Sequence, residues 1–294
     1  MVVRPRAGPA RTIPEVAGVH PHGDERLWPF TLLVFVASWV AWLPGLAGDQ
    51  LGSLALPVGA AGPALAALVL TLRRDGWAGV RRLLGTLLPG RVSARWYAVA
   101  VVGPPAVLAA GLGVHLALGG RVVGLVDPAH PDLPALPGGL LAVPLVFAAV
   151  LLLSVIGEEL GWRGYALPRL LRRATPLTAS LLLGGIWAAW HLPLLLDPTA
   201  LQHRMPTTWF VLQILGQGVL LTWLYQRTGG SVLLPALLHA AANTGVGVLP
   251  VLPLDTGGSS RPLWAALLQL YLILVVVVVR TGMHRRVPQP SGGS

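Results

Sequence analysis

The sequence contains no cysteine and no lysine, and only 11 of its 294 residues are acidic. The absence of cysteine excludes disulfides, dithiol redox pairs and thiolate metal sites. Charged residues make up 11% of the chain and hydrophobic residues 54%, and the mean hydropathy is +0.69. This composition argues against an ordinary soluble domain and is typical of a protein embedded in a membrane.

Long apolar runs follow one another along most of the chain. A helix needs ~20 apolar residues to cross ~30 Å of hydrocarbon, so we expect an all-α, polytopic transmembrane bundle. The first run is too long for the core of a signal peptide and is expected to be retained as a helix. The eight expected spans are 27–47, 55–72, 95–118, 139–163, 176–196, 207–226, 231–249 and 262–279.

The spans and the connections between them are expected to form a single transmembrane domain, 28–282. Residues 1–27 and 283–294 are expected to be a flexible N-terminal tail and a disordered C-terminal tail. Two connections, 73–91 and 167–173, mix arginine with leucine. This mixture predicts short amphipathic helices that lie on an anionic membrane surface.

The arginines fall in alternate connections between the apolar runs. By these span limits, 18 of the 21 lie on one side of the membrane and three on the other. An excess of basic residues marks the cytoplasmic side. We therefore predict a multi-pass protein of the cell (inner or plasma) membrane with both termini in the cytoplasm. The same distribution argues against nucleic acid as a partner.

Two adjacent glutamates, Glu158 and Glu159, lie at the end of the fourth apolar run. A carboxylate at membrane depth costs ~2.5–3.5 kcal/mol on insertion scales, so it usually faces the protein interior and has a function. Arg163 follows Glu159 by one helical turn and can pair with it, while Glu158 points ~100° away. The alternative is that both glutamates lie at the interface and only pair with Arg163. Flanking glycines would let another helix approach closely: Gly157, Gly161 and Gly164.

Two histidines lie within other spans. His191 shares a helix face with Trp187, and Pro193 is expected to kink the helix just beyond it. His239 shares a face with Asn243, with only alanines between them. The alternative for each histidine is a structural hydrogen bond.

Further polar side chains within the apolar runs include His115, Gln213 and Gln217. His115 has no polar partner one helical turn away and is interpreted as structural. Gln213 and Gln217 are four residues apart and either line the same cavity as the histidines or join two helices. Contact between helices is the favoured interpretation.

Together, these residues supply a carboxylate, a histidine and a His/Asn pair from three separate spans. A carboxylate and a histidine can activate water as base and acid. A second histidine and an asparagine amide can stabilise an oxyanion. These groups suffice to hydrolyse an amide inside the bilayer without a nucleophilic serine or cysteine.

The order of these motifs resembles the CPBP family of intramembrane proteases, also called the Abi family, which includes the type II CAAX prenyl endopeptidases. The motifs are Glu-Glu-x-x-x-Arg at 158–163, aromatic-x-x-x-His at 187–191 and His-x-x-x-Asn at 239–243, within a core of 139–249. The family often has phenylalanine where this chain has Trp187.

The resemblance implies a helical bundle around a cavity and an endopeptidase that acts on a membrane-associated or lipidated protein or peptide. Family members cleave prenylated C-terminal tails or take part in bacteriocin maturation or self-immunity. The implied catalytic residues are Glu158 as the base, His191 beside it, and His239 with Asn243 as oxyanion donors. The implied supporting residues are Glu159, Arg163 and Trp187.

A catalytic zinc ion is the alternative to a glutamate-activated water, because Glu158, His191 and His239 could supply three ligands. Against zinc, the His-Glu-x-x-His pattern is absent and Asn243 is a poor ligand. We also expect Arg163 to occupy the one carboxylate able to orient a zinc-bound histidine. No tightly bound cofactor is therefore expected.

Two other functions fit an intramembrane Glu/His set. A transporter or proton pathway uses the same residue types as relays. A membrane scaffold, such as an immunity factor that binds without cutting, needs no catalysis. A transporter predicts flux without cleavage, and a scaffold predicts that Glu158→Gln leaves the phenotype intact.

The arginine distribution predicts the topology directly. Reporter fusions after the 74–91 segment, after Arg173 and at the C-terminus should give cytoplasmic signals, and fusions within 120–136 and 252–260 should give external signals. A cytoplasmic signal from 120–136 would contradict the eight-span arrangement.

Overall fold

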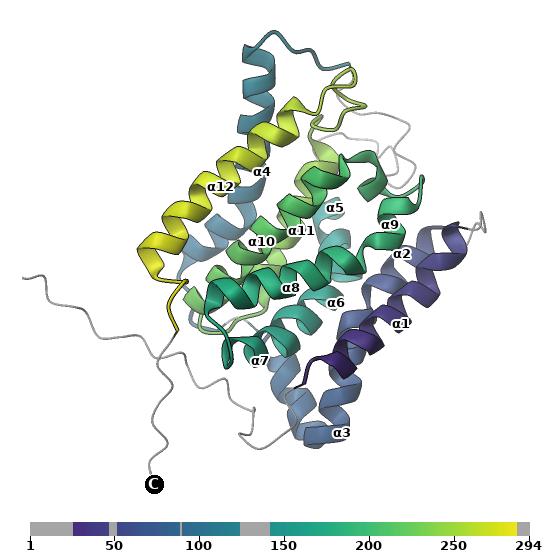
Figure 1. The fold of residues 1–294 in the computed structure, drawn as a ribbon, viewed down its shortest axis with the longest axis vertical. Coiled ribbons are helices and arrows are strands. Elements are labelled where there is room, and N and C mark those ends of the chain that lie inside the picture. The colour runs from purple at the N-terminus through teal and green to yellow at the C-terminus, as the bar shows by residue number, and fades with distance from the viewer. Residues whose placement is uncertain (1–25, 47–51, 89, 124–141, 287–294) are drawn as a thin grey trace, which may run out of the picture.

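The computed structural model describes residues 26–46, 52–88, 90–123 and 142–286, and this part of the chain is helical without strands (Figure 1). The expected all-α architecture is confirmed. The first helices are α1 (Trp28–Leu46), α2 (Gly52–Ala60), α3 (Gly62–Gly85) and α4 (Ala94–Ala117). Next come α5 (Val143–Val150), α6 (Ile156–Glu159), α7 (Leu167–Leu171), α8 (Pro176–Trp190) and α9 (Leu192–Leu196). The last are α10 (Thr207–Arg227), α11 (Leu233–Val248) and α12 (Arg261–Thr281).

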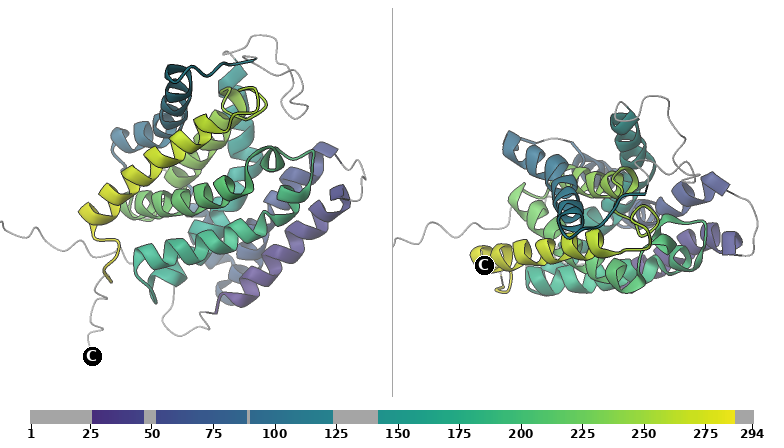
Figure 2. Two further views of the ribbon diagram at one scale, coloured as in Figure 1. Left: turned by 45° about the horizontal axis from the view of Figure 1, so that its top comes forward. Right: turned by 90° about the horizontal axis from the view of Figure 1, so that it is seen from above.

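Eight apolar helical segments in the described residues correspond to the eight expected spans. Five are long and apolar enough to cross a membrane: 55–85, 94–117, 143–171, 207–227 and 261–281. Three shorter apolar helices cover 28–44, 176–190 and 233–248. Figure 2 shows them as a bundle in which α4 packs on α11 and α12, α8 on α10, and α1 on α3. The outward face of α12 carries aliphatic side chains, as a surface in contact with lipid should.

The helix after the second span bends sharply within α3. Gly76 has φ 61° and ψ −164°, a conformation outside the helical region that glycine adopts without steric cost. The segment 77–85 is therefore a separate helical piece whose Val80 and Leu83 are buried while Trp77 is 69% exposed. The amphipathic helix expected between 73 and 91 is present in this form.

The fourth span does not end at Arg163 as expected but continues to Leu171. Two π-helical turns, η2 (Leu151–Val155) and η3 (Leu160–Ala166), lie before and after α6 in this continuous helix. Pro168 lacks an N–H and crowds the carbonyl of Gly164, which explains a wider turn directly before it. The amphipathic helix expected at 167–173 is correspondingly wrong, because Leu167, Pro168 and Arg169 are buried.

Two arginines that had been assigned to the cytoplasmic connection are buried in this span. Arg163 pairs with Glu159, and Arg169 donates to the Tyr165 carbonyl at 2.6 Å and lies 3.5 Å from that ring's centroid. Without them the arginine contrast falls from 18 against three to 16 against three, so the predicted orientation is unchanged.

Glycines let α3 approach the helix that carries the glutamates. A Cβ on Gly161 would lie 2.4 Å from Pro63 Cβ and 2.5 Å from the Pro63 carbonyl oxygen. A Cβ on Gly157 would lie 3.0 Å from the Ala60 carbonyl oxygen. The expected role of these glycines as close-packing positions is confirmed, and the contact fixes the glutamates against the α2–α3 junction.

The expected tails lie almost entirely outside the described residues, at 1–25 and 287–294. Met283, which the boundary at 283 assigns to the C-terminal tail, is buried, and its carbonyl accepts a hydrogen bond from the Leu177 N–H at 3.0 Å. The end of α12 is therefore attached to the start of α8.

Candidate active site

The two glutamates form the last turn of α6, between the two π-helical turns. Glu158 is 4% exposed and Glu159 is fully buried. Both carboxylates therefore face the protein interior. A change of helical register around α6 directs neighbouring carboxylates to different partners, which is a common use of π-bulges at functional sites.

Glu159 joins two helices. Its Oε1 accepts a hydrogen bond from Arg163 on the same helix at 2.9 Å and lies 2.9 Å from His239 Nδ1 on α11. A carboxylate oxygen accepts, so the His239 proton on this side lies on Nδ1. Glu159 therefore both neutralises Arg163 and fixes the orientation of the His239 ring.

Glu158 contacts the second motif through Trp187 on α8. The indole Nε1 donates to Glu158 Oε2 at 2.9 Å. The Trp187 carbonyl accepts from His191 Nδ1 at 2.9 Å, which leaves the lone pair of neutral His191 on Nε2. One residue therefore orients both the carboxylate and the histidine that were expected to activate water.

The Trp187 ring also contacts both histidines and Arg163. Its centroid is 5.0 Å from that of His239 and 5.7 Å from that of His191, and Arg163 Cζ lies 4.9 Å from the ring. The Arg163 contact is a cation–π geometry. Phenylalanine, common in the resembled family, would keep the ring contacts but would lose the hydrogen bond to Glu158.

His191 occupies the junction between α8 and α9, with φ −76° and ψ 0°. Pro193 begins the next short helix, so the break expected just beyond His191 is confirmed. The Nε2 atoms of His191 and His239 have no hydrogen-bond partner among the described residues.

The four residues proposed for catalysis line one cavity of about 260 Å³. Glu158 contributes from α6, His191 from the end of α8, and His239 and Asn243 from α11. Asn243 makes no side-chain hydrogen bond within the described part of the chain, so its amide is available to a ligand. Glu159 and Arg163 are not among the lining residues and support the cavity from behind.

Several lining residues carried no motif and were not proposed from the sequence. Trp190, Trp209 and Phe210 supply apolar walls. Gln213 and Gln217 also line the cavity and hydrogen-bond each other along α10, so the favoured interpretation that they join two helices is wrong. Their four-residue spacing in an apolar helix was the available signal.

His115 lies outside this cavity. Its Nε2 is 3.1 Å from the Arg121 carbonyl oxygen, at the end of α4. This contact supports the structural interpretation of His115.

One premise of the argument against zinc is wrong. Arg163 does not exclude His239 from Glu159, because the same carboxylate oxygen contacts both. Both histidines have the Nδ1 partners that zinc-bound histidines commonly use. The described residues nevertheless contain no group of three His, Asp or Glu side chains placed to hold one ion.

Residues 140–245 match the family described as type II CAAX prenyl endopeptidase Rce1-like. CAAX prenyl protease 2 of Methanococcus maripaludis is 35% identical over 115 residues, which are 37% of this chain and 42% of the relative. The chain thus spans less than half of the length of the curated relative that it matches.

The helical bundle and its buried Glu/His cavity define a polytopic membrane protein with an intramembrane carboxylate–histidine centre. Residues 140–245 of this chain are similar to the type II CAAX prenyl endopeptidases, the group that the three motifs resemble. The family resemblance drawn from the three motifs is confirmed.

Removing Arg163 should destabilise the protein, because it would leave the buried Glu159 charge without its main compensating cation. Breaking a buried ion pair from one side costs ~3–5 kcal/mol. We expect Arg163→Ala to lower the melting temperature in detergent clearly. Arg81→Ala, at an exposed position on α3, is the matched control and should have little effect. Equal melting temperatures for the two variants would contradict the bracing role of Arg163.

Proposed function

We propose that this protein is an intramembrane endopeptidase that hydrolyses a peptide bond of a membrane-associated or lipidated substrate. The observation that carries the proposal is the shared cavity of Glu158, His191, His239 and Asn243. The similarity of residues 140–245 to the type II CAAX prenyl endopeptidases supports it, and the name of the relative suggests a prenylated C-terminal tail as the first substrate to test.

In the proposed reaction Glu158 accepts a proton from a water molecule, and the hydroxide attacks the carbon of the scissile carbonyl. His191 Nε2 accepts a hydrogen bond from the same water and orients it. Glu158 then returns the proton to the leaving amine, so the step uses one water and needs no other reactant.

The oxyanion would be held by Asn243 and His239. The Asn243 amide donates without any change of protonation. His239 already directs its Nδ1 proton at Glu159, so it donates from Nε2 only as the imidazolium. Because Glu159 is already paired with Arg163, the oxyanion itself would offset the charge of the imidazolium.

Replacement of the catalytic groups tests the proposal. Glu158→Gln, His191→Ala and His239→Ala should each lower cleavage of a fluorogenic prenylated peptide by ~10²–10⁴-fold without loss of folding. Groups that act as a unit are non-additive, so Glu158→Gln with His191→Ala should lose little more than either alone. Full activity of Glu158→Gln would contradict the assignment.

His203→Ala is the matched control. This histidine is exposed, lies outside the cavity and hydrogen-bonds the Leu195 carbonyl. It should retain activity. A wild-type protein that cleaves no peptide but carries protons or solutes across vesicles would support the transporter instead. A Glu158→Gln variant that keeps the phenotype of the wild-type protein would support the scaffold.

We propose that the glutamate acts without a tightly bound metal, because Asn243 is a poor metal ligand and no three His, Asp or Glu side chains in the described part of the chain are grouped to hold one ion. Elemental analysis of active protein should find no stoichiometric zinc, and strong chelation should leave cleavage unchanged. One equivalent of zinc, removed together with activity and restored on adding it back, would make Glu158, His191 and His239 the metal ligands.

A further inference from the structure

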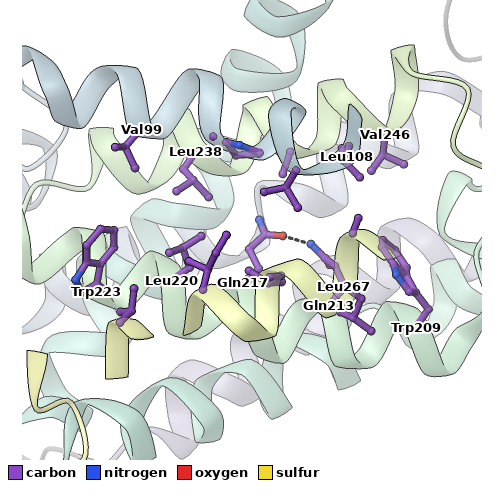
Figure 3. A pocket seen from close by; sticks show the side chains of 18 residues that line it. Val99, Leu108, Trp209, Gln213, Gln217, Leu220, Trp223, Leu238, Val246 and Leu267 are labelled. Carbon is purple, nitrogen blue, oxygen red and sulfur yellow. Dashed lines mark hydrogen bonds between the residues drawn. The ribbon is translucent and has the colours of Figure 1, made fainter. Parts of the chain in front are cut away.

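The catalytic cavity has an apolar neighbour. A second cavity of about 200 Å³ lies between α4, α10, α11 and α12, and we refer to it as the groove (Figure 3). The groove and the catalytic cavity share one wall. This wall consists of Trp209, Gln213, Gln217, Ala242 and Val246.

Two carboxamides interrupt an otherwise apolar lining. The remaining groove residues are aliphatic side chains, glycine, proline and two tryptophans, without a charged group. Figure 3 shows Gln213 and Gln217 projecting from α10 among these side chains. Polar groups in such surroundings need hydrogen-bond partners, since no bulk water is available in the bilayer core.

The two glutamines satisfy each other only in part. Gln213 Nε2 donates to Gln217 Oε1, which uses one donor and one acceptor of the pair. Gln217 is 4% exposed, and its Nε2 is buried without a partner among the described residues. Two primary amides carry four N–H groups and two carbonyl oxygens, so either orientation leaves donors and one carbonyl unused.

Those unused groups are the complement of a peptide group. A backbone carbonyl can accept from a glutamine N–H, and a backbone N–H can donate to the second glutamine carbonyl. A buried polar group left unsatisfied in the folded protein calls for a functional explanation. The position of the pair, between an apolar space and the catalytic residues, supplies one.

We propose that Gln213 and Gln217 bind the backbone of the substrate peptide beside the scissile bond, where the chain passes from the groove into the catalytic cavity. This inference rests on the proposed peptidase function and adds a backbone-binding site to it. The pair thereby selects extended peptides and sets their register relative to Glu158.

The first test measures steady-state kinetics of Gln217→Met, which keeps the size of the side chain and removes the amide. With a fluorogenic prenylated peptide we expect KM to rise about tenfold and kcat to change little, as for loss of uniform binding. Gln213→Met should act in the same direction. Gln269→Met, on α12 and outside both cavities, is the matched control.

The second test removes hydrogen-bonding groups from the substrate one at a time. Each backbone amide near the scissile bond is replaced by an ester, which lacks the N–H. One such ester should raise the wild-type KM but should have no further effect on Gln213→Met, because the unused carbonyl is that of Gln213 and the two changes remove the same interaction. Additive effects at every position would overturn the proposal and leave the pair a structural role.

A binding measurement separates failure of this inference from failure of the proposed function. In the Glu158→Gln background the same prenylated peptide should bind, and adding Gln217→Met should weaken Kd about tenfold. Binding that is unaffected by Gln217→Met would overturn the inference alone. Wild-type protein that neither binds nor cuts the peptide would overturn the proposed function and, with it, the inference.

Discussion

The burial of the Glu159 charge is the constraint on which the site depends. A fully buried carboxylate is tolerated only when cations or donors compensate it. Here Arg163 supplies a cation from the same helix and His239 supplies a donor from α11. The Arg163 Nη1 and His239 Nδ1 atoms each lie 2.9 Å from Glu159 Oε1. Because Glu159 is held in this way, the adjacent Glu158 is held too, and it is directed into the cavity. The contact between Glu159 and His239 therefore aligns the α6 glutamates with α11.

Trp187 provides the corresponding link to α8. Its indole N–H contacts Glu158, its carbonyl orients His191 and its ring packs on His239. Three motifs that are far apart in the sequence thus meet through one aromatic side chain and one carboxylate. A tryptophan gives this position a hydrogen bond that phenylalanine cannot give, so the carboxylate of this chain is more strongly oriented than an apolar aromatic residue would allow.

Hydropathy and motif spacing predicted most of the fold and the proposed catalytic set. Apolar runs longer than ~20 residues are sufficient to locate spans, and residues four apart on a helix necessarily share a face. The end of the fourth span was misplaced because Arg163 and Arg169 were interpreted as surface charges, whereas both are buried with specific partners. Contacts between helices, such as Glu159 with His239, depend on packing that no single-sequence pattern specifies. For the same reason, the spacing of Gln213 and Gln217 alone does not distinguish helix packing from a place in the cavity wall.

The two neighbouring glutamates show how position assigns different roles to the same chemical group. Glu159 lies behind the cavity wall, where its Oε1 contacts Arg163 and His239 and the side chain is fully buried. Glu158 lines the cavity beside His191 and Asn243, where a water and a peptide carbonyl can reach it. A general base needs that access and a geometry fixed before the substrate arrives. A helical register shifted by one residue would instead put Glu159 in the cavity and Glu158 against Arg163. The site therefore requires the register that the π-helical turns around α6 impose.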